Sequence, residues 1–195
     1  MTNQNELYFA YLKQRSTLGA LYRRYRLYPK LNQYLRGQTL DVGCGLGDML
    51  RFRENTVGVD INQLNVQYCT SMGLDAHLME PDVLPFPDGS FDSVLLDNVL
   101  EHIAKPGALL KEIRRVLKPG GNLVIGVPGV LGMQSDLDHK VFYSEEALQS
   151  LANKMSFKVE HIFYAPLWCS HFLSQVIRQY CIYTSWTPKA AQEGV

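Results

Sequence analysis

The sequence predicts an α/β fold, a doubly wound, mostly parallel sheet of six to seven strands with helices on both faces. Three observations lead to this prediction. Short apolar runs alternate with segments of helical periodicity along most of the chain. The first apolar run ends in a glycine cluster, as a strand does where it turns into a helix. The 195 residues, of which 46% are hydrophobic and 19% charged, are enough for one globular domain with its own core.

Charge is balanced over the whole chain but not along it. The chain has 19 Lys+Arg and 19 Asp+Glu, so its formal charge is zero and no polyanionic partner such as DNA is required. Residues 1–37 nevertheless hold seven basic residues and one acidic residue. This basic segment fits an anionic substrate, a phosphate or a membrane surface, and it equally fits a solvated helix face.

The cysteines and the N-terminus indicate a reducing, cytoplasmic setting. The four cysteines, too few for a disulfide scaffold, form no CxxC pair, so we expect no zinc and no other metal. The polar N-terminus lacks the apolar core of a signal peptide. The sequence contains no run of about 18 uninterrupted apolar residues, so we expect no membrane-spanning helix.

The chain begins with a predicted helical extension, residues 1–37, ahead of a core over 38–166 and an aromatic segment over 167–195. Apolar residues of the extension recur at helical spacing, with an interruption near Gly19 and an end before Pro29. These apolar residues are Leu7, Tyr8, Tyr11, Leu12, Leu18, Leu21, Tyr22 and Tyr25.

Six strands are expected in the core, each a short apolar run bounded by turn residues. They are Thr39–Val42, Thr56–Val59, Asp75–Met79, Phe91–Leu96, Asn122–Val127 and Phe157–Tyr164.

Helices are expected between these strands. The first passes through Leu46, Met49 and Leu50, and Asn62 can cap the second, which Gly73 can end.

Two further helices follow in the second half of the core. Pro106 opens one that Pro119-Gly120-Gly121 stops, and Ser144 starts the other. Beyond Pro166 the pattern is ambiguous, because residues 167–186 fit a helix, a closing strand or both.

The loop after the first strand is the first candidate for binding, since ligands of doubly wound sheets lie beyond the carboxyl ends of the strands. It reads Gly43-Cys44-Gly45-Leu46-Gly47-Asp48, and glycines let a backbone approach a ligand closely. A dinucleotide fingerprint, GxGxxG, needs a glycine where this chain has Asp48, which argues against NAD. The same loop also fits a tight strand-to-helix turn without a ligand.

Acidic side chains follow the next two strands. Asp60 ends the second strand, where a carboxylate can hold both hydroxyls of a ribose, or where it simply begins the next helix. Asp82, in the loop after the third strand, can accept a hydrogen bond from an adenine amino group beside Val83 and Leu84. That loop also fits a proline-rich surface turn.

Six segments in this order resemble the S-adenosylmethionine-dependent methyltransferases with a seven-stranded, Rossmann-like core. They read LDVGCGLGD, VGVD, PDVLPFPDGSFDSV, NVLEHI, LKPGGNLVIGVP and HKVFYSEEAL. The resemblance covers about two thirds of the chain, residues 39–165. It implies a methyltransferase of the small-molecule type that binds S-adenosylmethionine, releases S-adenosylhomocysteine and uses no metal.

The cofactor-binding residues that the resemblance implies fall in the loops after the first four strands. After the first strand, the residues that would line the amino-acid end of the cofactor are Asp41, Gly43, Cys44, Gly45 and Gly47. After the second strand, Asp60 and Ile61 would hold the ribose and adenine. After the third, Asp82 and Val83 would contact the adenine edge, and after the fourth, Asp97 and Asn98 would lie beside the sulfonium.

A histidine is the expected catalytic base. Methyl transfer from a sulfonium is an in-line displacement that needs alignment and a dry cavity, and a hydroxyl acceptor must also lose its proton. His139, after the fifth strand, is our first candidate and His102, after the fourth, the second. Each could instead hold its loop by hydrogen bonds, and many members of the family use no base. His77 and His161 are expected in strands.

Both the N-terminal extension and the aromatic segment after residue 166 have more than one possible role. In this family the N-terminal helix would close the mouth of the site, with Tyr8, Tyr11 and nearby arginines contacting an acceptor or a phosphate, although a plain core-and-surface helix fits as well. Those arginines are Arg15, Arg23 and Arg24. Tyr143 could border the acceptor. The aromatic segment after residue 166 could bury against the sheet, form a dimer or rest on a membrane.

We expect the acceptor to be small or medium-sized, with an oxygen on a sugar or glycan precursor receiving the methyl group. The chain ends resemble those of bacterial glycan-biosynthesis methyltransferases, and the basic first helix suits a nucleotide-sugar or lipid-phosphate. NVLEHI and LPFPDGSFD also resemble quinone- and lipid-type methyltransferases. A non-catalytic scaffold that binds S-adenosylmethionine is the alternative from another class. We expect no nucleic-acid substrate, and a monomer or homodimer.

Overall fold

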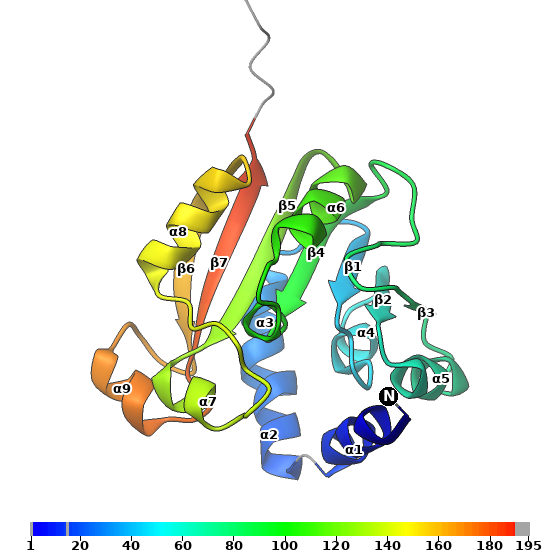
Figure 1. Ribbon diagram of the computed structural model, residues 1–195, viewed down its shortest axis with the longest axis horizontal. Coiled ribbons are helices and arrows are strands. Elements are labelled where there is room, and N and C mark those ends of the chain that lie inside the picture. Colours follow the sequence, from blue (N-terminus) through cyan, green and yellow to red (C-terminus); the bar gives the residue numbers. More distant parts are fainter. Residues whose placement is uncertain (1, 15, 190–195) are drawn as a thin grey trace, which may run out of the picture.

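The computed structural model describes residues 2–14 and 16–189, and its centre is a seven-stranded sheet of order β3-β2-β1-β4-β5-β7-β6 (Figure 1). Neighbouring strands are parallel except at β7, which is antiparallel to both β5 and β6. The predicted fold class is therefore confirmed. The strands are β1 (Thr39–Val42), β2 (Thr56–Asp60), β3 (Ala76–Leu78), β4 (Phe91–Asp97), β5 (Leu117–Pro128), β6 (Phe157–Ala165) and β7 (Cys181–Pro188).

Helices cover both faces of the sheet because the central strands are apolar on both sides. Leu95 of β4 packs in one cluster with Leu31, whereas its neighbour Leu96 packs in the other cluster with Ile113. The helices are α1 (Thr2–Lys13), α2 (Thr17–Tyr22), α3 (Tyr28–Asn32), α4 (Asp48–Phe52), α5 (Gln63–Ser71), α6 (Gly107–Val116), α7 (Val130–Gln134), α8 (Glu145–Lys154) and α9 (His171–Val176).

The N-terminal extension is helical, but its predicted breaks are wrong. The break between α1 and α2 comes before Gly19, which lies inside α2. Pro29 does not end the helix, because it falls at the start of α3, where a missing N–H costs nothing. A π-helical turn over Arg23–Leu27 precedes it and shifts the hydrogen-bond register.

The predicted helix starts are confirmed by their caps. The side chain of Asn62 accepts a hydrogen bond from the Leu64 N–H, and that of Ser144 accepts one from the Ala147 N–H. The five-residue helix α7 was not predicted, because its sequence is too short to show periodicity. Helix α6 ends at Val116 and β5 begins at the next residue, Leu117. Pro119-Gly120-Gly121 therefore lies within β5, just after the end of the helix.

The ambiguous segment after Pro166 contains both a helix, α9, and a closing strand, β7. Tyr183 and Trp186 of β7 are fully buried, whereas Trp168 and Phe172 are exposed. The aromatic segment thus packs partly on the sheet and partly faces outward. Its last residues, 190–195, lie outside the described residues, as do residues 1 and 15.

The order of the strands places a crevice between β1 and β4. From β1 the chain winds to β2 and β3 on one side and then returns to β4 and β5 on the other. The loops at the carboxyl ends of β1 and β4 leave the sheet in opposite directions. Doubly wound sheets bind their ligands in the crevice between two such loops. In Figure 1 these ends point toward α1, α2, α7 and α9.

Candidate active site

A cleft of about 530 Å³ lies at the carboxyl ends of β1 and β4, a volume within the usual range for small-molecule sites. Its floor consists of strand-end residues and its opposite wall of the N-terminal helices. Among the predicted cofactor residues, those that line it are Asp41, Gly43, Cys44, Gly45, Asp97 and Asn98.

The glycine loop needs its glycines for conformation and for space. Gly43 has φ 77° and Gly45 has φ 54°, a region that residues with a side chain rarely adopt. A Cβ on Gly43 would lie 2.5 Å from a methyl carbon of Val99. The N–H groups of Gly43 and Cys44 donate to the Val59 carbonyl at 2.8 and 3.0 Å, so the end of β2 fixes the turn.

Asp60 joins the glycine loop to the end of β2. Its carboxylate accepts hydrogen bonds from the Gly45 N–H (2.9 Å), the Asn62 N–H (2.8 Å) and the Asn65 amide (3.0 Å). Burial raises the pKa of Asp60, although the three donors oppose that shift. A carboxylate has about four acceptor positions, so about one stays available to a ligand hydroxyl.

The floor of the cleft is acidic. Asp41 is buried, and burial, followed by the nearby charges of Asp97 and Asp60, raises its pKa well above the usual range. Asp97 accepts hydrogen bonds from the Tyr183 hydroxyl and from the Asn98 amide, each at 2.9 Å. The carboxylate of Asp97 beside the cavity favours a ligand with a positively charged centre.

The remaining predicted cofactor residues, Asp60 among them, do not line the cleft itself. Gly47 is buried behind the loop, where it precedes α4. Ile61 and Val83 have exposed side chains on the loops after β2 and β3, and Asp82 is half-buried beside Val83. Because β3, β2 and β1 are adjacent and parallel, these residues lie along one edge of the sheet that continues from the cleft.

Several cleft residues come from the two ends of the chain. Tyr8, Tyr11 and Arg23 were expected as contacts, and all three line the cleft; Arg15 lies outside the described residues. Arg23 pairs with Asp48 at 3.2 Å, and its buried Nε has no hydrogen-bond partner among the described residues. The lining residues that sequence reasoning missed include Tyr22, Tyr28, Cys181 and Tyr183.

These missed residues carried little signal in the sequence. Tyr22 belonged to the periodic apolar face, which predicted packing rather than a site. Tyr28 directly precedes Pro29, where the helix was expected to end. Cys181 and Tyr183 lie on β7, whose segment was ambiguous. Burial raises the pKa of the Cys181 thiol, as do the nearby charges of Asp97 and Glu101.

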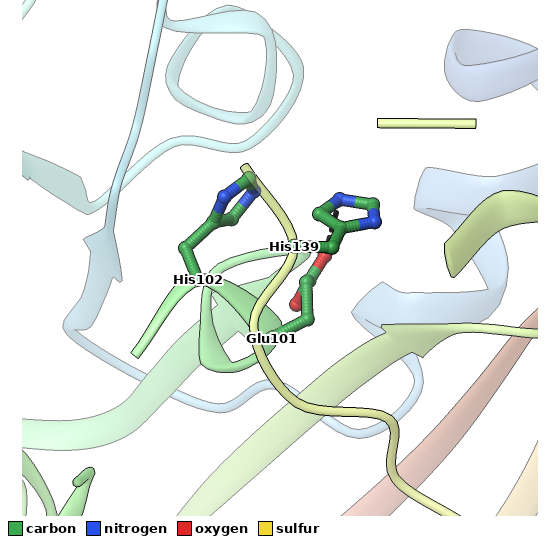
Figure 2. A group of neighbouring side chains, drawn as sticks. All are labelled: Glu101, His102 and His139. Atoms are coloured by element: carbon green, nitrogen blue, oxygen red, sulfur yellow. Dashed lines mark ion pairs between the residues drawn. The ribbon is translucent and has the colours of Figure 1, made fainter. Parts of the chain in front are cut away.

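The two candidate histidines form a cluster with Glu101 (Figure 2), and neither is among the residues that line the cleft. Glu101 and His102 lie on a short 3₁₀ turn after β4, and His139 on the loop between α7 and α8. The two imidazole centroids are 4.7 Å apart. His139 Nδ1 is 3.1 Å from the Met133 carbonyl oxygen, and its Nε2 is 3.8 Å from Glu101 Oε1.

Burial is the main cause of the pKa shifts of Glu101 and His102. It raises the pKa of Glu101 to about 8, with smaller contributions from the charges of Asp97 and Asp136. It also lowers the pKa of His102, as does the neighbouring His139. Glu101 was not singled out from the sequence, because nothing there distinguished it from an ordinary surface acid.

The other histidines lie away from the cleft. His77 and His161 are on β3 and β6, as predicted, and His171 begins α9. Tyr143 is buried in the larger core. Among the helices that the structure describes, none is long and apolar enough to span a membrane.

Comparison with protein families places a known domain over the strands that form the cleft. Residues 40–125 match the model of a methyltransferase domain. They run from β1 into β5 and include the glycine loop, Asp60 and Asp97.

Two curated proteins illustrate the similar relatives. The chain is 33% identical over 92 residues to an uncharacterized protein of Methanocaldococcus jannaschii, a match that covers 47% of this chain and 45% of that protein. It is 30% identical over 146 residues to the chloroplastic tocopherol O-methyltransferase of Arabidopsis thaliana, covering 68% of this chain and 40% of that enzyme. The chain thus spans less than half the length of either relative.

Solved structures share the fold across nearly the whole chain. The putative methyltransferase in a complex with the Trm112 methyltransferase activator of Haloferax volcanii has a TM-score of 0.77 at 17% identity, with 98% of this chain and 99% of that chain covered. A methyltransferase of Thermotoga maritima, described as a possible histamine N-methyltransferase, has a TM-score of 0.73 at 20% identity, with 95% and 99% covered. At such identities the likeness shows the fold alone.

Proposed function

The chain belongs to the Rossmann-like, S-adenosylmethionine-dependent methyltransferase family, and we propose that it transfers a methyl group from S-adenosylmethionine to a small or medium-sized acceptor. One observation carries the proposal. The matched methyltransferase segment contains the glycine loop and the acidic strand ends that line the cleft of about 530 Å³.

The side chains of the cleft suit this cofactor. S-adenosylmethionine supplies a methyl group on a positively charged sulfonium, and Asp97, held by Tyr183, gives the cleft a carboxylate for that charge. We assign Asp41, Gly43, Cys44, Gly45 and Gly47 to the amino-acid end and Asn98 to the sulfonium end.

The adenosine end fits the edge of the sheet beyond the cleft. Asp60 retains about one acceptor position, which suits one ribose hydroxyl; a second would have to displace the Asn65 amide. Ile61 and Val83, both exposed, offer apolar surface for an adenine ring, and Asp82 offers an acceptor for its amino group.

The N-terminal helices are proposed as a cover for this cleft. Leu12 of α1 is buried although most of α1 is exposed, and it lies over the glycine loop, 3.5 Å from a Cβ placed on Gly45. Arg23, from the turn after α2, lines the cleft, and its Nε has no hydrogen-bond partner among the described residues, so its guanidinium suits an anionic part of a ligand. The chain thus supplies alignment and exclusion of water, which methyl transfer requires.

For the acceptor we propose an oxygen of a sugar or glycan precursor. The basic residues of the N-terminal helices support an anionic precursor such as a nucleotide-sugar, because Arg23 reaches the cleft. The acceptor's proton would leave at the cluster of Glu101, His102 and His139. His139 is the first candidate for the base, since its Nδ1 faces the Met133 carbonyl and Nε2 is therefore the nitrogen that accepts a proton in the neutral ring, and His102 is the second.

A quinone- or lipid-type acceptor is the second candidate. It is favoured by the tocopherol O-methyltransferase relative and by a 36% identity over 102 residues to the 2-methyl-6-phytyl-1,4-hydroquinone methyltransferase of Synechocystis, a match covering 44% of this chain and 30% of that enzyme. Helix α9 lies toward the cleft end of the sheet (Figure 1). Phe172 of α9 and Trp168, just before it in the chain, are exposed and suit a lipid-like molecule.

Turnover with a panel of acceptors tests the proposal. The full chain is incubated with S-adenosylmethionine and a nucleotide-sugar, a quinol or a lipid phosphate, and S-adenosylhomocysteine is measured by chromatography. We expect turnover with the nucleotide-sugar. If tight cofactor binding is accompanied by no turnover with any member of the panel, the chain is a scaffold and the proposal of transfer is wrong.

A further inference from the structure

We propose that Glu101, His102 and His139 form a binding site for one divalent transition-metal ion, of which Zn²⁺ is the representative. Each side chain offers one ligand atom, and these atoms lie within 4.8 Å of one another (Figure 2). Sequence reasoning expected no metal because it looked for paired cysteines, and this site contains none.

The buried carboxylate of Glu101 is the first reason. Glu101 is 0% exposed, and neither of its carboxylate oxygens accepts a hydrogen bond from any other described residue. Burying an unpaired carboxylate is costly, and either a proton or a cation beside the group removes that cost. Among the described residues, the one basic side chain within 4.0 Å of the carboxylate is the imidazole of His139, at 3.8 Å.

The orientation of His139 is the second reason. Its Nδ1 lies 3.1 Å from the Met133 carbonyl oxygen, which can only accept, so the ring proton is on Nδ1. In the neutral ring, Nε2 then carries a lone pair that faces the oxygens of Glu101, at 3.8 Å, and of Asp136, at 4.0 Å. Facing lone pairs repel one another, and a metal ion between them turns that repulsion into coordination. A carbonyl on the far ring nitrogen is also how metal-binding histidines are usually held.

The spacing of the three ligands is the third reason. Zn²⁺ binds nitrogen and carboxylate oxygen at about 2.0–2.1 Å, so ligand atoms around a tetrahedral ion lie roughly 3.4 Å apart. The separation of 3.8 Å between His139 and Glu101 is close to this value, and His102 needs to move inward by at most about 1.4 Å, because all ligand atoms lie within 4.8 Å of one another. His102 is only partly buried.

The ligand types select the class of metal. Two imidazoles and one carboxylate suit Zn²⁺ and its transition-metal neighbours rather than Mg²⁺ or Ca²⁺, which prefer oxygen ligands. Three protein ligands leave at least one coordination position open. Its use by an acceptor oxygen would rest on the proposed function, with the metal in place of His139 promoting loss of the proton; binding of the ion does not depend on that function.

Calorimetry with the metal alone tests the site. The full chain, without a polyhistidine tag and treated with EDTA, is titrated with ZnCl₂. We expect one ion per chain. Glu101→Gln and His139→Asn are each expected to weaken binding by at least about 100-fold, since even partners one step further from a metal are worth about 10- to 100-fold. Zn²⁺ is also expected to raise the unfolding temperature of the wild type but not of these variants.

His77→Asn is the matched control. His77 also lies beside a carboxylate, with its Nε2 2.8 Å from Asp75, but this pair is exposed and has no third ligand. The control is therefore expected to bind Zn²⁺ as the wild type does. If Glu101→Gln does not fold, the partly exposed His139→Asn carries the test.

Three results would overturn the inference. The first is the absence of saturable Zn²⁺ binding, and the second is equal Zn²⁺ binding by the wild type and His139→Asn. The third is a combination: Zn²⁺ does not change the stability of the wild type, and Glu101→Gln is more stable than the wild type. The last result would mean that Glu101 simply holds a proton. Binding of S-adenosylhomocysteine, measured on the same samples, keeps failure of this inference separate from failure of the proposed function.

Discussion

At the scale of single residues, Tyr183 fixes the floor of the cleft. Its ring is fully buried and stacks on Phe163, with centroids 5.3 Å apart, and its hydroxyl donates to Asp97. Gly126, on the neighbouring strand, leaves the space for this ring, because a Cβ there would overlap it. The carboxylate of Asp97 is therefore held where β4 ends.

Removing that hydroxyl tests the arrangement. Tyr183→Phe removes this buried hydrogen bond to Asp97, so we expect the free energy of unfolding in urea to fall by about 1.5–3 kcal/mol, and cofactor affinity to fall as well. Tyr180→Phe is the control, since its hydroxyl bonds to Ser170 and Trp168, away from Asp97. A Tyr183→Phe variant with unchanged stability and affinity would show that Asp97 needs no such support.

At the scale of elements, Glu112 and Arg115 of α6 hold the loop between β3 and β4. Glu112 accepts a hydrogen bond from the Leu84 N–H at 3.1 Å, and Arg115 donates to the carbonyls of Leu84 and Phe86 at 3.0 and 2.7 Å. The hydrogen bond from Arg115 is the main reason that the pKa of Glu112 is lowered to about 2.

This shift predicts how stability depends on pH. The pKa of Glu112 is lower in the folded chain, so its stabilisation is present above the unfolded pKa of about 4.3 and is lost as pH falls toward 2. Because the pair is partly exposed, Glu112→Gln is expected to cost only about 1 kcal/mol at pH 7. In urea titrations, the difference in the free energy of unfolding between this variant and the wild type should vanish between pH 5 and pH 2. A difference that stays constant over this range would contradict the prediction. Glu80→Gln, at an exposed position, is the control.

The elements show what local sequence can and cannot predict. Caps at Asn62 and Ser144 and the runs of β1, β2 and β4 were predictable, because local hydrogen bonds and apolar patterns fix them. Three predictions about helices were wrong: the break near Gly19, the end before Pro29, and the absence of a helix where α7 lies. These errors share one cause: packing and hydrogen-bond register decide whether a short helix continues.

At the scale of the whole molecule, the site is assembled from distant parts of the chain. The glycine loop and Asp97 were predictable, since each follows a strand whose end faces the crevice. Cys181 and Tyr183 were not, because their place beside β5 depends on the antiparallel return of β7. Glu101 gains its properties only by burial beside His139, a contact across 38 positions that no local pattern reveals.

The proposed cofactor bridges the glycine loop and the end of β2. Asp60 is the residue that joins these two elements, through its bonds to Gly45 and Asn62. Asp75 gives a matched control, because it is an exposed carboxylate just before β3 whose side chain pairs with His77.

Calorimetric titration of the full chain with S-adenosylhomocysteine tests this claim most directly. We predict one binding site per chain, with an affinity at least about tenfold weaker in Asp60→Ala, a loss of about 1.4 kcal/mol or more, and unchanged in Asp75→Ala. Circular dichroism verifies that each variant is folded. Absence of binding to the wild type, or equal affinity in a folded Asp60→Ala, would contradict the account.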